Sequence, residues 1–218
     1  MRLSATDLAC HRGGREVFAG VSFSVASGET LTVSGRNGAG KSSLLRTIIG
    51  LVRAAGGRLT LEDGDPELSI AEQAHYLGHQ DALKGSLSVA ENLRFWAGYL
   101  GGGSGEIDKN IENKIQEKIQ EKIHEPLEAV GLAGLAALPA AYLSAGQRRR
   151  LSIARLIAVP RPIWLLDEPA STLDAAAQAR LADLMRAHLG GGGLIVAAAH
   201  GPIGLGNTQE LRLGEAQA

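Results

Sequence analysis

One eight-residue run constrains this chain more than any other feature: Gly-Arg-Asn-Gly-Ala-Gly-Lys-Ser at residues 35–42. It follows a short β-rich segment, residues 31–34, and precedes residues 43–50, which read as a helix closed by a glycine. Glycines in such a turn let successive backbone N–H groups point inward, and the helix N-terminus adds about half a positive charge. The order of strand, anion-binding turn and helix predicts the start of a parallel α/β unit.

The run also matches the pattern G-x-x-x-x-G-K-[ST], which predicts a binding site for nucleotide phosphates. We expect Lys41 to reach the β- and γ-phosphates of ATP and to be catalytic, and the Ser42 hydroxyl to coordinate Mg²⁺. The residues expected to bind the nucleotide here are Gly35, Arg36, Asn37, Gly38, Ala39, Gly40, Lys41, Ser42 and Ser43.

A second apolar run ends in two carboxylates, Leu-Leu-Asp-Glu at residues 165–168. Ligands of parallel sheets bind beyond the carboxyl ends of the strands, which is where these side chains are expected to lie. Asp167 is therefore expected to hold Mg²⁺ through water, and Glu168 to act as the general base that polarises the attacking water. Taken alone, an apolar run followed by Asp-Glu is a helix N-cap as often as a catalytic pair. The presence of the phosphate loop in the same chain favours the catalytic pair.

The remaining pattern predicts an α/β core interrupted by a helical lobe. Strands are predicted at residues 3–9, 15–26, 31–34, 163–166 and 194–199. The first two alternate apolar and polar positions around Gly13 and Gly14, which indicates a β-hairpin. Residues 89–159 read as mainly helical, and residues 175–189 read as a further helix.

Isoleucines recur every four residues from Ile107 to Ile123, with lysine–glutamate pairs three residues apart between them. Such pairs stabilise an isolated helix. On a helix of 3.6 residues per turn, a four-residue repeat drifts by about 40° per step, so the isoleucines wind around the helix. We expect a solvated insertion helix here, with a partner-binding helix as the alternative.

Residues 143–147 read Leu-Ser-Ala-Gly-Gln, and Asp167 follows about twenty residues later. Locally this is a helix start capped by Ser144. Together with the phosphate loop it resembles the ATP-binding cassette (ABC) ATPases, whose signature is usually Leu-Ser-Gly-Gly-Gln, with alanine here in place of the first glycine. The resemblance implies that Ser144, Ala145, Gly146 and Gln147 cap the γ-phosphate held by another subunit. A homodimer at the nucleotide is therefore expected.

The same resemblance assigns roles to three more positions. Gln80 resembles the Q-loop glutamine, which touches Mg²⁺ and the attacking water, so it is expected to be both catalytic and a metal ligand. Asp174 ends a segment similar to the D-loop, which crosses the dimer interface. His200 resembles the switch histidine near the γ-phosphate and is expected to be catalytic. Without the resemblance these would be a surface glutamine, a helix cap and a structural histidine.

A tyrosine that often stacks on adenine in ABC ATPases is missing near the end of the first predicted strand. His11 or Arg12 could stack there as a flat imidazole or cation. We therefore expect base binding to be weak and poorly selective.

The resemblance also implies the fold: α/β, with the parallel-sheet core of a P-loop NTPase (RecA-like), an N-terminal antiparallel β-subdomain and an inserted helical ABC subdomain. A single ABC ATP-binding domain is expected over residues 1–218. Its core is expected at about 1–85 and 160–218, its helical lobe at about 86–159, and an insertion-like helix at about 106–125.

Further marks resemble the ATP-binding subunits of the cytochrome c maturation, or haem exporter, systems. They are Cys10, Arg12, Arg15, Phe18, Gly20, Ser22-Phe23, Leu77-Gly78-His79-Gln80, Leu87, Glu91-Asn92-Leu93 and the residues of the signature. This resemblance implies an ATP hydrolase of the translocase type, paired with an integral membrane subunit. It implies a peripheral place on the cytoplasmic face of the bacterial inner membrane, and a role in haem export or haem-chaperone release. No direct haem site is evident, because Cys-x-x-Cys-His is absent and the six histidines are scattered.

The composition argues against other classes. The formal net charge is −1, so no global field favours nucleic acid, and the run Arg148–Arg150 is interpreted as helix-surface and interface charge. No nucleic acid partner is expected. No apolar stretch approaches the ~20 residues of a membrane helix, no signal peptide is expected, and the single Cys10 precludes an internal disulfide. Two alternatives stay open: the ATPase of another small-substrate ABC exporter, and a soluble non-transport ABC protein.

Overall fold

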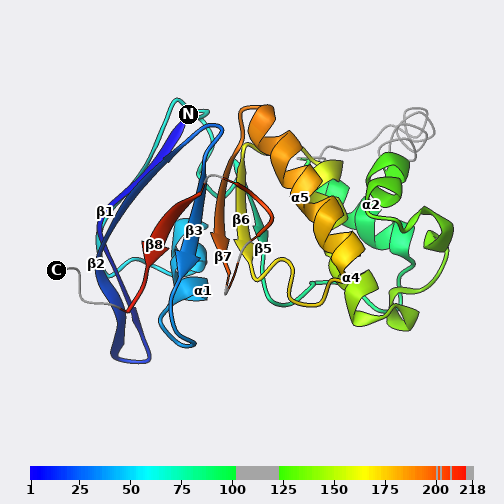
Figure 1. Cartoon of the computed structure of the whole chain (residues 1–218), viewed down its shortest axis with the longest axis horizontal. Coiled ribbons are helices and arrows are strands. Elements are labelled where there is room, and N and C mark those ends of the chain that lie inside the picture. The colour runs from blue at the N-terminus through cyan, green and yellow to red at the C-terminus, as the bar shows by residue number, and fades with distance from the viewer. Residues whose placement is uncertain (102–122, 200, 202, 207, 215–218) are drawn as a thin grey trace. The chain divides into compact units, whose positions relative to one another are not determined.

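The computed structural model describes residues 1–101, 123–199, 201, 203–206 and 208–214, which fall into two compact units. The first unit takes in Met1–His79, Arg161–Pro169 and Ala182–Ala218. The second takes in Gln80–Pro160 and Ala170–Leu181. Figure 1 labels the helices and strands of both.

An antiparallel sheet opens the first unit, with the strand order β2-β1-β4. Its strands are β1 (Arg2–Arg12), β2 (Arg15–Ala26) and β4 (Gly56–Glu62). Gly13 and Gly14, both with positive φ, connect β1 to β2, as the two-residue hairpin pattern predicts. The alternation in β1 buries one face of the sheet, where Leu3 pairs with Val25 on one side and Leu61 on the other.

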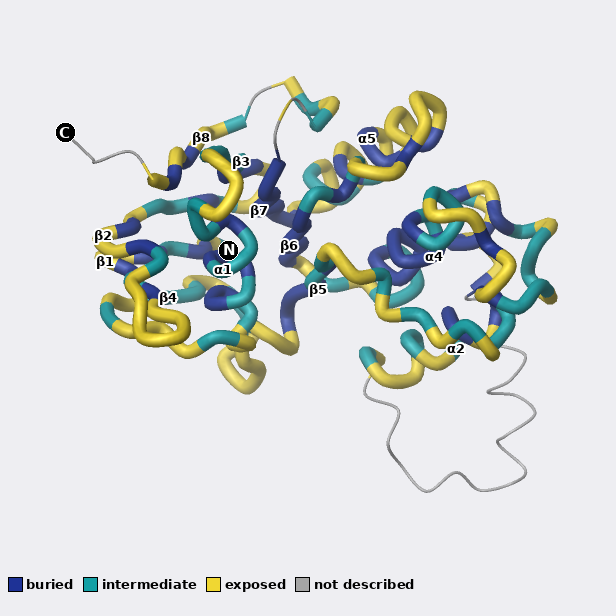
Figure 2. Tube along the Cα trace, turned by 90° about the horizontal axis from the view of Figure 1, so that it is seen from below, coloured by how far each residue is buried: buried dark blue, intermediate teal, exposed yellow. Residues whose placement is uncertain are grey.

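A parallel sheet follows, with the strand order β5-β6-β7-β3-β8. Its strands are β3 (Thr30–Ser34), β5 (Ala74–Leu77), β6 (Ile163–Asp167), β7 (Leu194–Ala198) and β8 (Gln209–Arg212). Every residue of β6 and β7 is buried, as their continuous apolar runs predict (Figure 2). Because neighbouring strands are all parallel, their carboxyl ends meet at one edge of the sheet.

Helix α1 (Lys41–Ile48) joins the two sheets of the first unit, because it packs against β1 as well as β6 and β7. Leu44, Leu45 and Ile48 are almost fully buried in the core that the two sheets share. Each side chain of this size stabilises the fold by about 1.5–3 kcal/mol when buried. The helix ends before Gly50, whose φ of +80° is typical of a glycine C-cap.

The second unit is helical, as the fold class predicts. It contains α2 (Val89–Leu100), a helix at residues 123–129, the 3₁₀ turns η1 (Ala133–Leu135) and η2 (Ala140–Tyr142), and α4 (Ala145–Ala158). Helix α5 (Ala175–Gly190) begins in this unit and ends in the first. Helices α2 and α4 pack together, and each has a fully buried leucine, Leu93 and Leu151. No helix in the described ranges is long and apolar enough to cross a membrane.

Most of the isoleucine repeat falls on residues 102–122, outside the described residues. The last isoleucine of the repeat, Ile123, is described, and it is only 3% exposed. It lies on the helix at residues 123–129, whose Leu127 is also buried. The expectation of a solvated helix is therefore wrong for Ile123, which belongs to the apolar interior of the second unit.

Candidate functional site

The glycine-rich turn lies between the end of β3 and the start of α1. Gly35 has a φ of +139°, and a Cβ there would lie 2.5 Å from the Leu213 carbonyl oxygen. Gly40 has a φ of +101°, and a Cβ there would lie 2.7 Å from a Val17 methyl. A side chain at position 35 would clash with the backbone, and one at position 40 would have to displace the Val17 side chain. No side chain caps the start of α1, so its first N–H groups are available to an anion.

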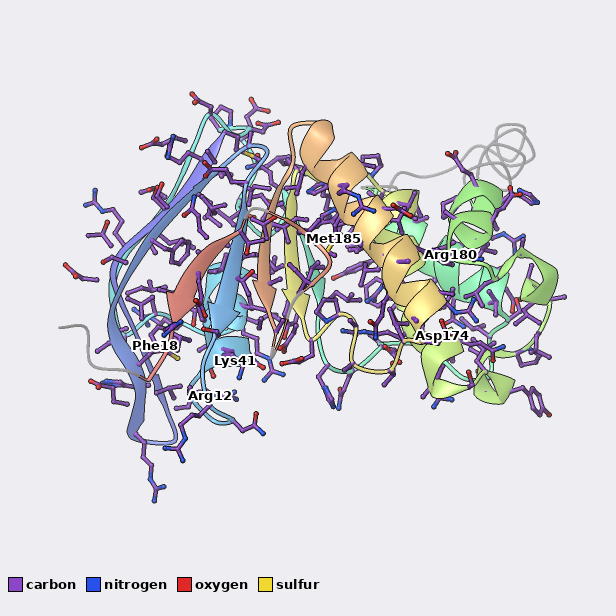
Figure 3. The ribbon with its side chains drawn as sticks, in the orientation of Figure 1. Arg12, Phe18, Lys41, Asp174, Arg180 and Met185 are labelled. Atoms are coloured by element: carbon purple, nitrogen blue, oxygen red, sulfur yellow. The ribbon has the colours of Figure 1, made fainter. Side chains whose placement is uncertain are left out.

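Lys41 is the first residue of α1, and only 8% of it is exposed. Its Nζ donates hydrogen bonds to the carbonyl oxygens of Gly35 (2.8 Å) and Arg36 (3.4 Å). The turn therefore wraps around the ammonium group. Figure 3 shows Lys41 near the carboxyl ends of the parallel strands, the edge at which ligands of such sheets bind.

Ser42 and Asp167 are 125 positions apart in the chain and touch in the structure. The Ser42 Oγ donates a hydrogen bond of 2.9 Å to Asp167 Oδ1 at the end of β6, and Asp167 is 2% exposed. A hydroxyl and a carboxylate are hard oxygen ligands of the kind that Mg²⁺ prefers. The described residues hold no group of three or more His, Cys, Asp or Glu that could bind a metal. Proteins usually bind Mg²⁺ through one or two carboxylates together with phosphates and water.

Tyr76 contacts Asp167, and Arg46 contacts Tyr76 in turn. Neither residue was predicted from the sequence. The Tyr76 hydroxyl on β5 donates to Asp167 Oδ2 at 3.4 Å and accepts from Arg46 Nε at 3.2 Å. Burial raises the pKa of the Tyr76 phenol, and the hydrogen bond with Tyr76 raises the pKa of Arg46. At neutral pH the phenol therefore keeps its proton and Arg46 its charge. The only signal in the sequence was a tyrosine four residues before Gln80.

Glu168 follows β6 directly and adopts an uncommon backbone conformation. Its φ is +48°, in the left-handed region that non-glycine residues seldom occupy. Its backbone N–H donates a 2.9 Å hydrogen bond to the Ala198 carbonyl at the end of β7, which helps to hold this conformation. Strained residues of this kind cluster at functional sites. His200, two residues beyond β7, lies outside the described residues.

The signature residues begin α4 in the second unit. The Ser144 Oγ accepts from the Gln147 backbone N–H at 3.2 Å, and the Gln147 Oε1 accepts from the Ser144 N–H at 2.8 Å. This is a complete capping box. Gly146 lies against the D-loop segment, since a Cβ there would be 3.0 Å from the Thr172 carbonyl oxygen. Asp174 is exposed and caps α5 by accepting from the Ala177 N–H at 2.8 Å.

Gln80 is exposed at the start of the second unit, and the two residues after it are held firmly. The Ser152 hydroxyl donates to the Asp81 carbonyl at 2.8 Å, and the Trp96 indole donates to the Ala82 carbonyl at 3.0 Å. Ala82 has a φ of +53°, so these contacts keep it in a conformation that alanine rarely adopts. The segment next to Gln80 is thereby fixed to both α2 and α4.

Comparison with known proteins places the chain in a family. Residues 18–171 match the family model described as ABC transporter. The chain belongs to the ABC transporter ATP-binding proteins. It is 56% identical to the cytochrome c biogenesis ATP-binding export protein CcmA of Nitrobacter winogradskyi, over 99% of this chain and 100% of that protein.

Solved structures agree with this membership. The ATP-binding subunit of an ABC transporter is 25% identical, with a TM-score of 0.76 over 92% of this chain and 80% of that one. A dimeric ATP-binding cassette bound to ADP and phosphate is 21% identical, with a TM-score of 0.75 over 91% of this chain and 88% of that one. The second likeness shows the fold alone. As an ABC ATPase, the chain binds and hydrolyses ATP.

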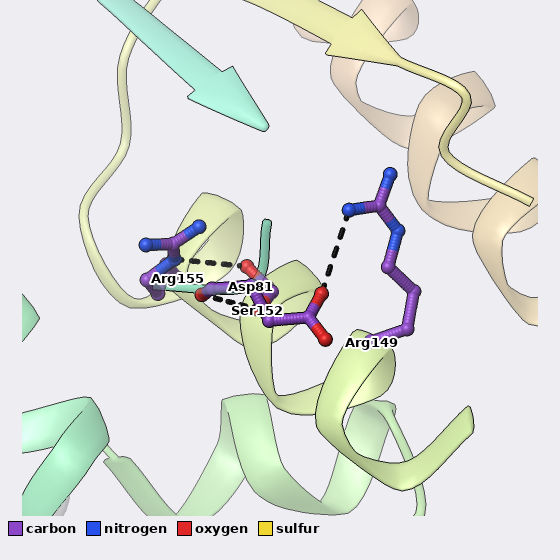
Figure 4. A network of polar contacts seen from close by, with 4 residues as sticks. All are labelled: Asp81, Arg149, Ser152 and Arg155. Carbon is purple, nitrogen blue, oxygen red and sulfur yellow. Dashed lines mark hydrogen bonds and ion pairs between the residues drawn. The ribbon is translucent and has the colours of Figure 1, made fainter. Parts of the chain in front are cut away.

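The arginine run of this ABC ATPase differs from its sequence interpretation. Arg149 is 3% exposed and forms an ion pair with Asp81, 3.5 Å between Nη1 and Oδ1 (Figure 4). The interpretation of the run as surface charge is therefore wrong for Arg149. Arg155 is also buried, which lowers its pKa to about 10, and its guanidinium lies 4.6 Å from the Trp96 ring centre. Arg150 donates to the carbonyl oxygens of residues 130 and 131, which follow the helix at 123–129.

We expect Asp81→Asn to destabilise this ABC ATPase by about 2 kcal/mol, because it leaves the buried Arg149 cation without its carboxylate. The loss is smaller than for a fully buried pair, since 23% of the Asp81 side chain is exposed. Denaturant unfolding measures the change. Asp183→Asn is the matched control, because the Asp183–Arg186 pair is exposed and contributes at most about 0.5 kcal/mol. Equal effects of the two substitutions would show that the Asp81 pair is not a structural anchor.

Proposed function

We propose that this chain is the ATPase subunit of an ABC complex that drives cytochrome c maturation, through haem export or haem-chaperone release. The observation that carries the proposal is the 56% identity, over nearly the whole of both chains, with a protein named for cytochrome c biogenesis and export. The ATP hydrolase alone is common to many ABC systems, so the cargo rests on this relationship and not on the site.

The turn at residues 35–43 is proposed to bind the phosphates of ATP through backbone N–H groups and Lys41. Its uncapped helix start and its enclosed ammonium group are both suited to anions. Ser42 and Asp167 would hold Mg²⁺, with Gln80 as a further ligand, and the ion would neutralise charge on the phosphates. Their hydrogen bond already brings the two oxygen ligands together.

Glu168 is proposed as the general base, with Gln80 and His200 as the other catalytic side chains. The position of Glu168, one residue beyond the proposed metal carboxylate and in a strained conformation, supports this role. A carboxylate that accepts the proton of water as it attacks the γ-phosphate contributes about 10²–10⁴ to the rate.

Two copies of the chain are proposed to enclose each nucleotide, with Ser144 to Gln147 of one capping the γ-phosphate in the other. The capping box is compatible with this role. The Ser144 hydroxyl accepts from the Gln147 N–H, so its own proton is still available for a phosphate oxygen. Asp174 is exposed in the single chain. A residue that contacts a second copy must be exposed in this way before the copies meet.

The base is proposed to be held weakly, with His11 or Arg12 beside it. Both residues are exposed, and Phe18 close by is buried, so it offers little ring surface.

An integral membrane subunit is the proposed partner. The chain would then lie on the cytoplasmic face of the inner membrane. The ATPase of another exporter is the second candidate, with identical chemistry and a different cargo.

Removing this chain from the bacterium that encodes it tests the proposal. We expect c-type cytochromes, detected by their covalently attached haem, to be lost, because the complex would then have no source of energy. The wild-type chain should restore them. Total haem and b-type cytochromes, whose haem is not covalently attached, serve as the control. Unchanged c-type cytochromes in the deletion strain would favour the other exporter.

A further inference from the structure

The carboxylate of Asp167 is contacted from two sides. Ser42 donates to Oδ1 at 2.9 Å, and Tyr76 donates to Oδ2 at 3.4 Å. Tyr76 reaches it from the neighbouring strand, because the pairing of β5 with β6 places Tyr76 opposite Leu165, two positions before Asp167. Asp167 is 2% exposed, so protein groups rather than bulk water set the orientation of its carboxylate.

Tyr76 is itself held in place by a residue of α1. Arg46 donates from its Nε to the Tyr76 hydroxyl at 3.2 Å, and Arg46 lies one helical turn after Ser42 on α1. Hydrogen bonds therefore link Ser42 through Asp167 and Tyr76 to Arg46, and both ends of this series lie on α1. All four residues belong to the first unit.

Gly78 makes room for the Tyr76 ring. A Cβ at position 78 would lie 3.0 Å from Cε1, 3.2 Å from Cζ and 3.3 Å from the hydroxyl oxygen of Tyr76. These separations are shorter than ordinary carbon contacts, so any larger residue would push the ring and move its hydroxyl. The glycine thus allows the ring the position from which it reaches Asp167.

We propose that Tyr76, supported by Arg46, is a positioning residue that orients the Asp167 carboxylate for the Mg²⁺ of bound nucleotide. This inference rests on the proposed role of Asp167 as the metal carboxylate. The physical reason is general: the groups that orient a metal site's carboxylate by hydrogen bonds also set the metal affinity, and losing such a partner lowers it about 10–100-fold.

Tyr76→Phe tests the proposal, because it keeps the ring and removes only the hydroxyl. ADP binding to the full chain is measured by calorimetry with Mg²⁺ and with EDTA, and the Mg²⁺ concentration that gives half of the full affinity is determined. We expect that concentration to rise about tenfold, while binding in EDTA stays within about twofold because no phosphate contact is removed. Tyr99→Phe, on the exposed face of α2, is the matched control and should change neither value.

Three results would overturn the proposal. An unchanged Mg²⁺ requirement in Tyr76→Phe would show that the phenol does not orient the carboxylate. An equal loss of affinity with Mg²⁺ and with EDTA would show that Tyr76 only supports the fold around the turn. Wild-type ADP binding that ignores Mg²⁺ would remove the role of Asp167 and with it this inference. The proposed part in cytochrome c maturation is judged separately, by the c-type cytochromes of the deletion strain.

Discussion

Lys41→Ala is expected to lower the rate of ATP hydrolysis at least about a hundredfold, the cost of removing one preorganised group that stabilises transferred charge. The ammonium group is buried and held by two carbonyl oxygens of the turn, so the substitution removes a positive charge whose position is fixed. Phosphate release by the purified chain at saturating ATP and Mg²⁺ measures the effect.

Lys84→Ala is the matched control for Lys41. Lys84 is exposed in the second unit, and only its backbone groups take part in the described hydrogen bonds. Its rate should equal that of the wild type. Activity of Lys41→Ala within about threefold of wild type, far from the loss expected for such a group, would show that the turn does not bind the transferred phosphate.

Glu168→Gln is expected to keep ATP binding and lower hydrolysis by about 10²–10⁴. Glutamine has the same shape, so the backbone bond to Ala198 and the φ of +48° should persist. The attacking water loses its base, and the repulsion between the carboxylate and the γ-phosphate disappears. Two chains should then stay closed around unhydrolysed ATP.

Size exclusion with ATP and Mg²⁺ measures this trapped dimer. The same variant with ADP should elute as a monomer, because ADP lacks the phosphate that the signature residues are proposed to cap. A variant that stays monomeric with ATP would count against a dimer closed by the nucleotide, and wild-type hydrolysis in the variant would exclude Glu168 as the base.

Local patterns predicted most of the fold. The paired glycines at 13 and 14, the buried runs of β6 and β7 and the helix after the glycine-rich turn each follow from residues close in sequence. Strands β4, β5 and β8 were missed, and all three lie at sheet edges. Strands β4 and β8 expose many of their residues, so neither has an apolar run to mark it. Strand β5 has only four residues, too few to show a pattern.

The sequence predicted those residues of the candidate site that belong to recognisable motifs, and it missed the others. Tyr76 escaped because its role depends on β5 pairing with a strand almost ninety positions later, and no local pattern records that pairing. Arg149 escaped because three successive arginines do not show which one faces inward. Its spacing to Ser152 and Ile153, both buried, was the available sign. The chemical roles of Glu168, Gln80 and the signature residues are still predictions.

The capping box at the start of α4 determines which positions of the signature tolerate substitution. Ser144 and Gln147 hold the helix start through their side chains, and Gly146 has the Thr172 carbonyl 3.0 Å from where a Cβ would lie. Position 145 has no such constraint: it is an exposed first helical residue, where alanine is more favourable than glycine by up to about 1 kcal/mol. The usual signature has glycine at positions 145 and 146, and the single departure from it falls at position 145, where alanine favours the helix and disturbs no described contact.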